Sequence, residues 1–259
     1  FHPLRARKLP HRMQFLLESI RELSSNLASL GSRLICVSGP SVTLMPELVK
    51  RWGITRVVAH RWTEPFGRTR DARIAESLSV PMTLYEGETL HPPGTLRTGK
   101  GTPYSVFTPF SRALRKAARI SEPLPKPKGL GAVPSVAMKD NEEIPCLETL
   151  GISRNPHLQA GGESAAGARL KLFLEQRVGT YCVGRDQLGE PATSRLSADI
   201  KFGTLSVRTI WRSVEELDVK GQGESAETFL NELVWRDFSY STLWDRPEVL
   251  RVPFRPSWK

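Results

Sequence analysis

The sequence predicts an α/β domain followed by an all-α domain, and three features of the chain support this. Short apolar segments alternate with amphipathic ones in the first third, as in folds built on a parallel sheet. A stretch rich in Pro, Gly and basic residues comes next. From Glu163 onward the apolar residues recur at helical spacing, without a strand pattern. We therefore expect the α/β part at 1–118, a linker at 119–160 and the helical part at 161–259.

The first predicted element is an amphipathic helix at 11–31, which Gly31 ends. Its apolar stripe recurs at spacings of four and three residues and consists of Leu16, Ile20, Leu23, Leu27 and Leu30. A short buried strand, RLICVS, is predicted at 33–38. Because a doubly wound sheet usually starts with a strand before its first crossover helix, we also expect one or two strands upstream of Phe1.

The alternation then continues through the rest of the α/β part. The sequence predicts, in order, a helix at 43–53, a strand at 56–60, a helix at 67–78 and a strand at 81–86. Short apolar strands in a β-α-β-α-β order predict a parallel sheet with right-handed crossovers.

The linker at 119–160 shows no clear periodicity. We expect it to wrap around the domains without packing, and a disordered spacer is the alternative. The helical part begins with a helix from Glu163, whose apolar face consists of Ala166, Leu170, Phe173 and Leu174. Two further helices are predicted at 205–217 and 226–243.

The composition limits the classes of partner and site. The formal net charge is +10, with 37 Lys and Arg against 27 Asp and Glu. Such a surplus favours polyanionic partners such as nucleic acids, although a basic soluble enzyme has the same composition. The 3 cysteines lie far apart without a CxxC pair, which argues against disulfides and zinc and suits a reducing cytoplasm. The 5 histidines are also scattered, so we expect no metal site.

Targeting signals are not apparent in the sequence. No apolar run approaches the ~20 residues that a membrane span needs. The N-terminus has no apolar core like that of a signal peptide, and it does not begin with Met. We therefore expect a fragment or a processed product that does not enter a membrane.

Residues 190–206, EPATSRLSADIKFGTLS, combine hydroxyl side chains with alternating apolar positions. Ser197 has the residue type of a helix N-cap, and Asp199 would stand in the first turn. Hydroxyls beside free N–H groups at a helix start suit a phosphate, while a simple capping turn is the alternative. Neither GxGxxG nor GxxxxGKS occurs in the chain, so the familiar nucleotide loops are excluded.

Upstream of this stretch, Tyr181 and Arg185 are four residues apart and would share a helix face. Arg185 is a candidate for binding a phosphate. It is equally suited to pair with Asp186 or Glu190 on the surface.

Downstream, the segment AETFLNELVWRDFSYSTLW places four functional side chains at three- and four-residue spacing, namely Phe229, Glu232, Trp235 and Arg236. An indole can stack on a base, a guanidinium can bind phosphate, and a carboxylate can accept a hydrogen bond from a base. The alternative is an i,i+4 ion pair of Glu232 with Arg236 beside a half-buried Trp235.

Taken together, several blocks resemble the photolyase/cryptochrome family in order and approximate spacing. These blocks are GTPYSVFTPFSRA, GESAAGARLKLFL, YCVGRD, EPATSRLSADIKFGTLSVRTIW and FLNELVWRDFSY, and RWTEPFGRTRDARIAESL is similar to the corresponding α/β segment. The resemblance covers nearly the whole chain and is to the class I-like cyclobutane pyrimidine dimer photolyases. It implies a Rossmann-like α/β domain able to house an antenna pigment, followed by the N-terminal part of a helical FAD-binding domain.

The resemblance also implies roles for individual residues. Positions that match FAD contacts are Tyr181, Thr193, Ser194, Arg195, Leu196, Ser197 and Phe229, with the 193–197 run at the FAD phosphates. Positions that match DNA or lesion contacts are Arg185, Glu232, Trp235 and Arg236. Trp235 would stack on the dimer and Glu232 would hydrogen-bond its bases. None of the implied roles is that of a catalytic residue.

The implied reaction is light-driven electron donation from reduced FAD to a flipped-out dimer in DNA, which splits and returns the electron. Glu232 favours the cyclobutane-dimer enzymes, because the animal-type (6-4) and cryptochrome branch tends to carry Gln there. We expect a monomer in the cytoplasm with access to DNA. A blue-light photoreceptor without repair activity, or a truncated inactive product, are the alternatives.

The sequence departs from the family pattern in two places. Family members continue well beyond Lys259, so we expect the chain as given to bind FAD weakly or not at all. Phe66 and Gly67 stand where folate-binding members carry polar contacts. A folate antenna is therefore not expected, and the identity of any other antenna pigment is open.

Overall fold

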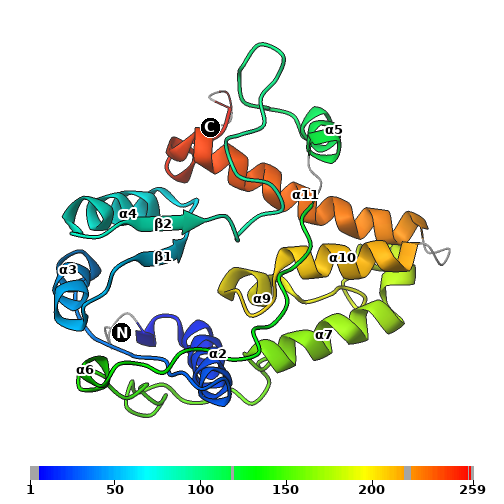
Figure 1. Ribbon diagram of the computed structural model, residues 1–259. Helices are drawn as coiled ribbons and strands as arrows, with labels where there is room; N and C mark the ends of the chain where they lie inside the picture. The colour runs from blue at the N-terminus through cyan, green and yellow to red at the C-terminus, as the bar shows by residue number, and fades with distance from the viewer. Residues whose placement is uncertain (1–5, 118–119, 219–222, 256, 258–259) are drawn as a thin grey trace. The chain divides into compact units, whose positions relative to one another are not determined.

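The computed structural model describes residues 6–117, 120–218, 223–255 and 257 (Figure 1). The chain forms two compact units that interleave along the sequence. Unit 1 comprises the residues up to Ile54, Leu124–Leu172 and Arg195–Leu205, and unit 2 comprises Thr55–Pro123, Phe173–Ser194 and the residues from Ser206. The sequence-based division at 118 and 160 follows chain order instead, and it stays a prediction.

The described residues are mainly helical. The helices of unit 1 are α2 (Pro10–Ser29), α3 (Ser41–Trp52), α6 (Ser135–Met138) and α9 (Ser197–Phe202), and α7 (Glu163–Gln176) begins in unit 1 and ends in unit 2. Unit 2 contains β1 (Val57–His60), α4 (Pro65–Ser77), β2 (Met82–Tyr85), α5 (Phe107–Ala117), α8 (Tyr181–Gly184), α10 (Val207–Asp218) and α11 (Gly223–Asp245). Short 3₁₀ turns η1 (Val178–Thr180) and η2 (Pro247–Leu250) complete it. No helix in these described ranges is long and apolar enough to cross a membrane.

The two strands of unit 2 form a small parallel sheet, with Val57 opposite Met82 and His60 opposite Tyr85. Helix α4 connects them and lies beside them in Figure 1. The strands predicted at 56–60 and 81–86, the helix between them and their parallel pairing are therefore confirmed. A strand forms where a neighbouring strand can complete its backbone hydrogen bonds. Here β2 follows β1 after a single helix, so the sequence contains both partners close together.

The strand predicted at 33–38 is wrong, because this segment joins no sheet among the described residues. Its polar backbone groups bind the 141–142 segment instead. The N–H of Glu142 donates to the carbonyl of Cys36 at 2.7 Å, and the N–H of Cys36 donates to Asn141 Oδ1 at 2.9 Å. The N–H of Ser38 donates to Glu142 Oε1 at 2.9 Å. A strand-like sequence forms a ladder only where another strand supplies partners, and here side chains and one backbone bond replace it.

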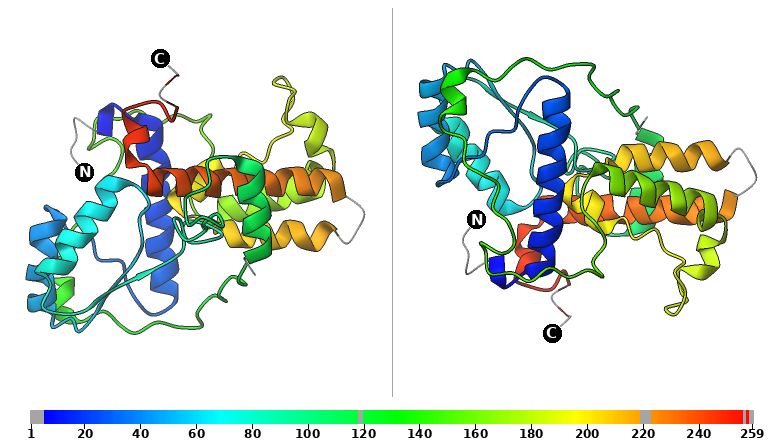
Figure 2. Two further views of the ribbon diagram at one scale, coloured as in Figure 1. Left: turned by 90° about the horizontal axis from the view of Figure 1, so that it is seen from above. Right: turned by 90° about the horizontal axis from the view of Figure 1, so that it is seen from below.

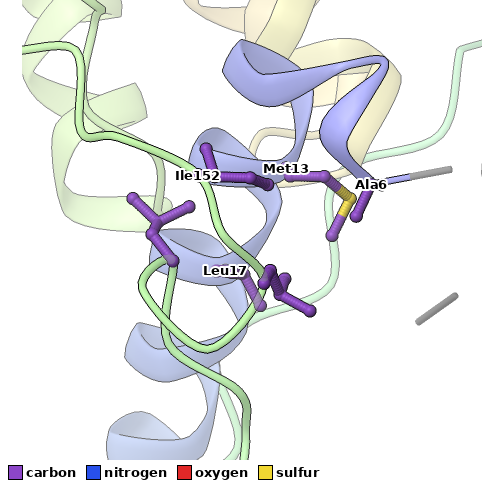
Figure 3. Packing of buried hydrophobic residues seen from close by; sticks show 6 residues of the cluster. Ala6, Met13, Leu17 and Ile152 are labelled. Carbon is purple, nitrogen blue, oxygen red and sulfur yellow. The ribbon is translucent and has the colours of Figure 1, made fainter. Parts of the chain in front are cut away.

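The core of unit 1 lies between the first half of α2 and the 147–152 segment. Its buried side chains are Ala6, Met13, Leu17, Leu147, Leu150 and Ile152. Figure 3 shows Met13 and Leu17 from α2 packed beside Ile152. Part of the stretch that we expected to wrap without packing therefore contributes to a hydrophobic core.

Helix α2 itself is confirmed, but its buried face differs from the predicted apolar stripe. The buried residues are Met13, Gln14, Phe15 and Leu17, whereas Leu23 is 39% exposed. The spacing of the stripe establishes which residues share a face of the helix. Burial of that face depends on a packing partner, and residues 147–152 pack mainly on Met13 and Leu17, with Leu16 of the stripe partly buried at the edge.

The helical part matches the prediction closely. On α7 the side chains of Ala166, Leu170 and Phe173 are buried, and α10 and α11 correspond to the predicted helices at 205–217 and 226–243. Helices α10 and α11 lie side by side, and α5 packs on α11 (Figures 1 and 2).

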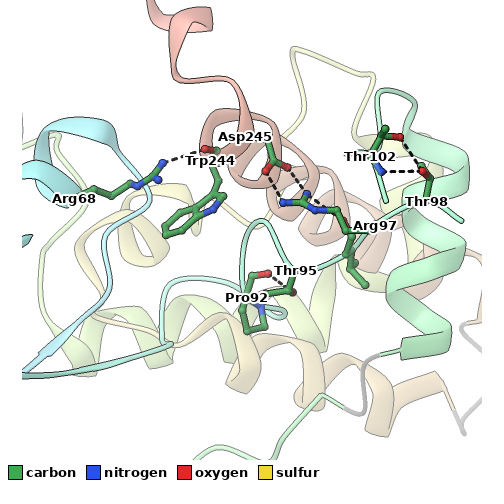
Figure 4. Close-up of polar contacts among 9 residues, drawn as sticks. Arg68, Pro92, Thr95, Arg97, Thr98, Thr102, Trp244 and Asp245 are labelled. Carbon is green, nitrogen blue, oxygen red and sulfur yellow. Dashed lines mark hydrogen bonds and ion pairs between the residues drawn. The ribbon is translucent and has the colours of Figure 1, made fainter. Parts of the chain in front are cut away.

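The C-terminal end of α11 anchors the loop that follows β2 (Figure 4). Arg97 forms a bidentate pair with Asp245, with both N–O distances at 2.8 Å. Arg68 donates to the carbonyl of Trp244 at 3.0 Å, and its guanidinium lies 3.8 Å from the centre of the indole ring. These contacts fix the position of α11 within unit 2.

Candidate functional site

A pocket of about 630 Å³ opens in unit 2 where α5, α8 and α11 meet. Helix α11 contributes Glu232 and Trp235, and the α8 segment contributes Arg185. Helix α5 contributes Phe107 and Arg112. The structure thus brings together three of the four residues that the sequence assigned to DNA contact.

Trp235 presents a flat aromatic surface at this pocket. Its side chain is 43% exposed, although it stands on a helix whose neighbouring residues are buried. The indole stacks on Phe107, with a ring-centroid distance of 3.7 Å and an interplanar angle of 4°. Phe238 meets the indole edge-on at 5.8 Å. Since Phe107 covers one ring face and Phe238 supports the edge, the indole is held in a fixed orientation for stacking a planar ligand.

Glu232 and Arg185 form an ion pair at the same pocket. Arg185 also lies 3.7 Å from Asp186. The sequence left open whether Arg185 pairs with Asp186 or Glu190, and in the structure it contacts Asp186. It also pairs with Glu232, which is 47 residues away in the sequence. Glu232 therefore has Arg185 as its ion-pair partner, whereas the alternative from the sequence was Arg236. Both side chains of the pair are about one third or more exposed, so they can exchange partners for a ligand at modest cost.

Arg236 is not among the residues that line the pocket. Its Nη1 donates to the carbonyl of Glu88 at 2.6 Å, and its guanidinium lies 4.2 Å from the Tyr240 ring. The side chain is only 18% exposed. In this structure Arg236 therefore supports the loop after β2, and it does not join Glu232 and Trp235.

Two of the predicted flavin-contacting residues lie together in an aromatic cluster of unit 2. Tyr181 meets Phe229 edge-on at 5.2 Å, and Phe173 packs against both rings at 5.8 and 4.5 Å. Both Tyr181 and Phe229 are buried. Burial raises the pKa of the Tyr181 hydroxyl, so the group stays a neutral donor at physiological pH.

The prediction that Ser197 caps α9 is wrong. Ser197 is the first helical residue, and Leu196 occupies the capping position without a side-chain capping hydrogen bond. The reason is the backbone at Arg195, which adopts a left-handed φ of 53° and brings the chain into the helix one residue earlier. Leu196 is buried, whereas Thr193, Arg195 and Ser197 are exposed.

Asp199 is fully buried and fixes α9 within unit 1. Arg169 of α7 donates to its two carboxylate oxygens at 3.0 and 2.5 Å. Thr204 Oγ1 donates to Asp199 Oδ1 at 3.0 Å. The residue that the sequence placed in the first helical turn therefore acts as the buried half of a bidentate ion pair.

Asp237 is a buried carboxylate on α11, the helix that also carries Glu232 and Trp235. The N–H of His91 donates to its Oδ2 at 3.0 Å, while Oδ1 has no hydrogen-bond donor within the described residues. Burial raises the pKa of Asp237 to about 7, against the opposing effects of the His91 N–H and of Arg236. The carboxyl group therefore titrates near neutral pH while it holds the loop after β2.

We expect this carboxyl group to make stability depend on pH. Between about pH 4 and pH 7 the folded chain keeps a proton on Asp237 that the unfolded chain has lost, so stability falls as pH rises through that range. Asp237→Asn should remove the effect. Chemical denaturation at pH 4.5, 5.5, 6.5 and 7.5 would give the stability of each protein. The wild-type value minus the Asn value should fall with pH, by at most about 1.4 kcal/mol per unit. A difference independent of pH would contradict the assignment.

Known proteins resemble this chain over almost its whole length. A family model described as DNA photolyase matches residues 1–128. The deoxyribodipyrimidine photo-lyase of Thermus thermophilus is 35% identical over 258 residues, which is 99% of this chain and 56% of the relative. The chain belongs to the photolyase/cryptochrome family. The deoxyribodipyrimidine photo-lyase of a Synechococcus strain is 29% identical over 96% of this chain and 54% of its own length. The chain spans about half the length of these curated relatives.

Solved structures of the family agree with this fold. A bacterial class III photolyase from Agrobacterium tumefaciens matches 96% of this chain and 53% of its own chain, with a TM-score of 0.84 and 29% identity. A Synechocystis cryptochrome has a TM-score of 0.80 at 24% identity and shows the fold alone. The helix-rich architecture with a small parallel sheet is thus the family's fold. The finer arrangement of antenna, linker and flavin domains remains a prediction.

The photolyase/cryptochrome resemblance also raised the question of an antenna pigment. In unit 2, Phe66 is 81% exposed, whereas Gly67 is buried against Trp62. A Cβ on Gly67 would lie 2.7 Å from Trp62 Cβ, so the glycine is required for packing. Packing against Trp62 therefore explains the glycine at position 67 without reference to a pigment. The absence of a folate antenna stays a prediction.

Sequence reasoning missed the contribution of α5 to the pocket of this family member. Phe107 and Arg112 stand in the last part of the stretch that we assigned to the α/β domain, before the linker predicted at 119–160. The signal was present in the spacing, since Phe107, Phe110 and Leu114 form an apolar stripe and the last turn carries Arg115 and Lys116. The apolar stripe of α5 predicts a helix, but it does not show that this helix packs on α11.

Proposed function

We propose that the protein repairs cyclobutane pyrimidine dimers in DNA with the help of light, as a deoxyribodipyrimidine photo-lyase. The observation that carries the proposal is the pocket in which an oriented, exposed indole stands beside a carboxylate and a guanidinium. The indole of Trp235 stacks on the two pyrimidine bases, and Glu232 accepts hydrogen bonds from their edges. Arg185 is placed to contact the adjoining phosphate.

FAD is the proposed cofactor, and the residues present fit its anionic part. The side chains of Thr193 and Ser197 are exposed, so that each hydroxyl can donate a hydrogen bond to a phosphate oxygen. Tyr181 and Phe229 are the proposed aromatic contacts. When bound, FAD supplies the electron that splits the dimer.

The direct test is light-dependent loss of dimers from ultraviolet-irradiated DNA. Purified protein supplied with excess FAD is incubated with the DNA in blue light or darkness, after chemical reduction of the flavin. We expect dimers to disappear only in the light. Dimer-specific binding without repair would instead favour a photoreceptor, and absence of both would refute the proposal.

Trp235→Ala should weaken binding to dimer-containing DNA by about 1–3 kcal/mol, because the stacking surface is removed. The indole is 43% exposed, so the fold should change little. Trp235→Phe is the matched control and should recover part of the affinity, since a smaller aromatic ring remains above Phe107. Fluorescence anisotropy with a labelled duplex would measure both. A Trp235→Ala protein with unchanged preference for the dimer would contradict the stacking role.

A further inference from the structure

We propose that α5 is a second DNA-contacting element, in which Arg112 and Lys116 bind the phosphates of the strand beside the pocket. The inference rests on the proposed function, because it takes DNA to be the ligand of this pocket. It concerns a different helix and different residues from those that the family resemblance implied.

The first observation is the position of the two cations. Arg112 lines the pocket that also contains Trp235, and Thr108 lines it one helical turn earlier. Lys116 stands four residues after Arg112, so it shares the same face of the helix. The stripe of Thr108, Arg112 and Lys116 therefore runs from the pocket outward, with about 6 Å between successive residues.

The second observation is that these two charges are uncompensated. Arg112 and Lys116 are both exposed, and within the described residues neither side chain forms an ion pair or hydrogen bond. The other arginines at the pocket are already engaged. Arg115 contacts Glu227 at 2.6 Å and Asn231 at 3.2 Å, and Arg185 pairs with Glu232. The outer face of α5 thus offers positive charge at the rim that is available to a ligand.

The third observation is the rigidity of the helix. Phe110 and Leu114 are buried at 2% and 0% exposure, and Phe110 packs on Phe238 of α11 at 5.2 Å. Phe107 stacks on Trp235. The same helix that supports the indole therefore sets the position of the cations relative to it, as Figures 1 and 2 show for α5 beside α11.

The chemistry of the pocket favours phosphate at this place on its rim. Neutral bases can enter a pocket whose wall includes carboxylates, whereas their phosphates stay outside because burying an unpaired anion is costly. Cations that hold these phosphates add affinity for any sequence, damaged or not, and position the strand for the base contacts.

The test measures how DNA binding depends on salt in the wild type and in the Arg112→Gln/Lys116→Gln double variant. Two labelled duplexes of one sequence, with and without a dimer, are titrated between 50 and 200 mM salt. The slope of log K against log salt should become shallower by about 1.8 for both duplexes, because each phosphate that a cation neutralises contributes about 0.9. The preference for the dimer should stay unchanged. Arg112→Gln alone should give about half of the change in slope.

The matched control is Lys50→Gln/Arg73→Gln, which removes two exposed helix cations that do not line the pocket. It should leave the slope as in the wild type. An unchanged slope in the α5 variant, or a decrease in affinity confined to the dimer duplex, would overturn the inference. A wild type that binds DNA without preferring the dimer would count against the proposed function alone, because the slope on undamaged DNA still tests α5. A wild type that binds no DNA refutes both.

Discussion

Replacing Asp199 with alanine is expected to lower the free energy of unfolding by about 3–5 kcal/mol, since it removes one partner of a buried ion pair. Asp199 has no exposed surface, and Arg169 is only 17% exposed. Alanine would leave the guanidinium in a largely buried position without its two acceptors. It would also remove the acceptor of the Thr204 hydroxyl.

Two further variants separate the ion pair from a simple decrease in volume. Asp199→Ala combined with Arg169→Met should cost less than Asp199→Ala alone, because no unpaired charge remains. Asp186→Ala is the surface control, since that side chain is 80% exposed, and it should leave the denaturation midpoint near that of the wild type. Urea denaturation would measure all of them. A destabilisation by Asp199→Ala below about 1 kcal/mol would show that the pair contributes little.

Gly94→Ala should destabilise the protein by about 2–5 kcal/mol, from two causes that add. The φ of Gly94 is +77°, a left-handed conformation that costs a residue with a Cβ about 1–2 kcal/mol. The new Cβ would also collide with the Trp244 indole, and overpacking of this kind costs about 1–3 kcal/mol. Trp244 cannot move freely, because Arg68 lies on its ring and binds its carbonyl.

Other glycines of the chain provide the controls for the two causes. A Cβ on Gly53 would meet no atom within 4 Å although its φ is +66°, so Gly53→Ala measures the backbone cost alone. Gly99 has open space and no positive φ, so Gly99→Ala should be near neutral or slightly stabilising. In a Trp244→Ala background the Gly94 substitution should cost only as much as Gly53→Ala. Equal destabilisation by Gly94→Ala and Gly53→Ala in the wild-type background would contradict the clash.

The strand predicted at 33–38 did not form, and the buried face of α2 differs from its apolar stripe, for one common reason. The 33–38 segment has a strand sequence and α2 has an apolar stripe, but the sequence did not indicate which segments contact them. Ladder bonds and burial both require a second segment. In unit 1 the segments that supply contacts, 141–142 and 147–152, come from a stretch without periodicity, so the sequence contained no signal for them.

The sequence alone determined the strands at 56–60 and 81–86, the helices that follow Glu163 and the residue types of the candidate site, because local periodicity and composition report them directly. Only the tertiary structure decided which of these residues meet. It placed Arg185 on Glu232 across 47 residues, and it directed Arg236 to Glu88 across 148 residues. It also stacked Phe107 on Trp235. Spacing tells which side chains share a face of a helix, but their partners come from distant segments that only the packed chain brings into contact.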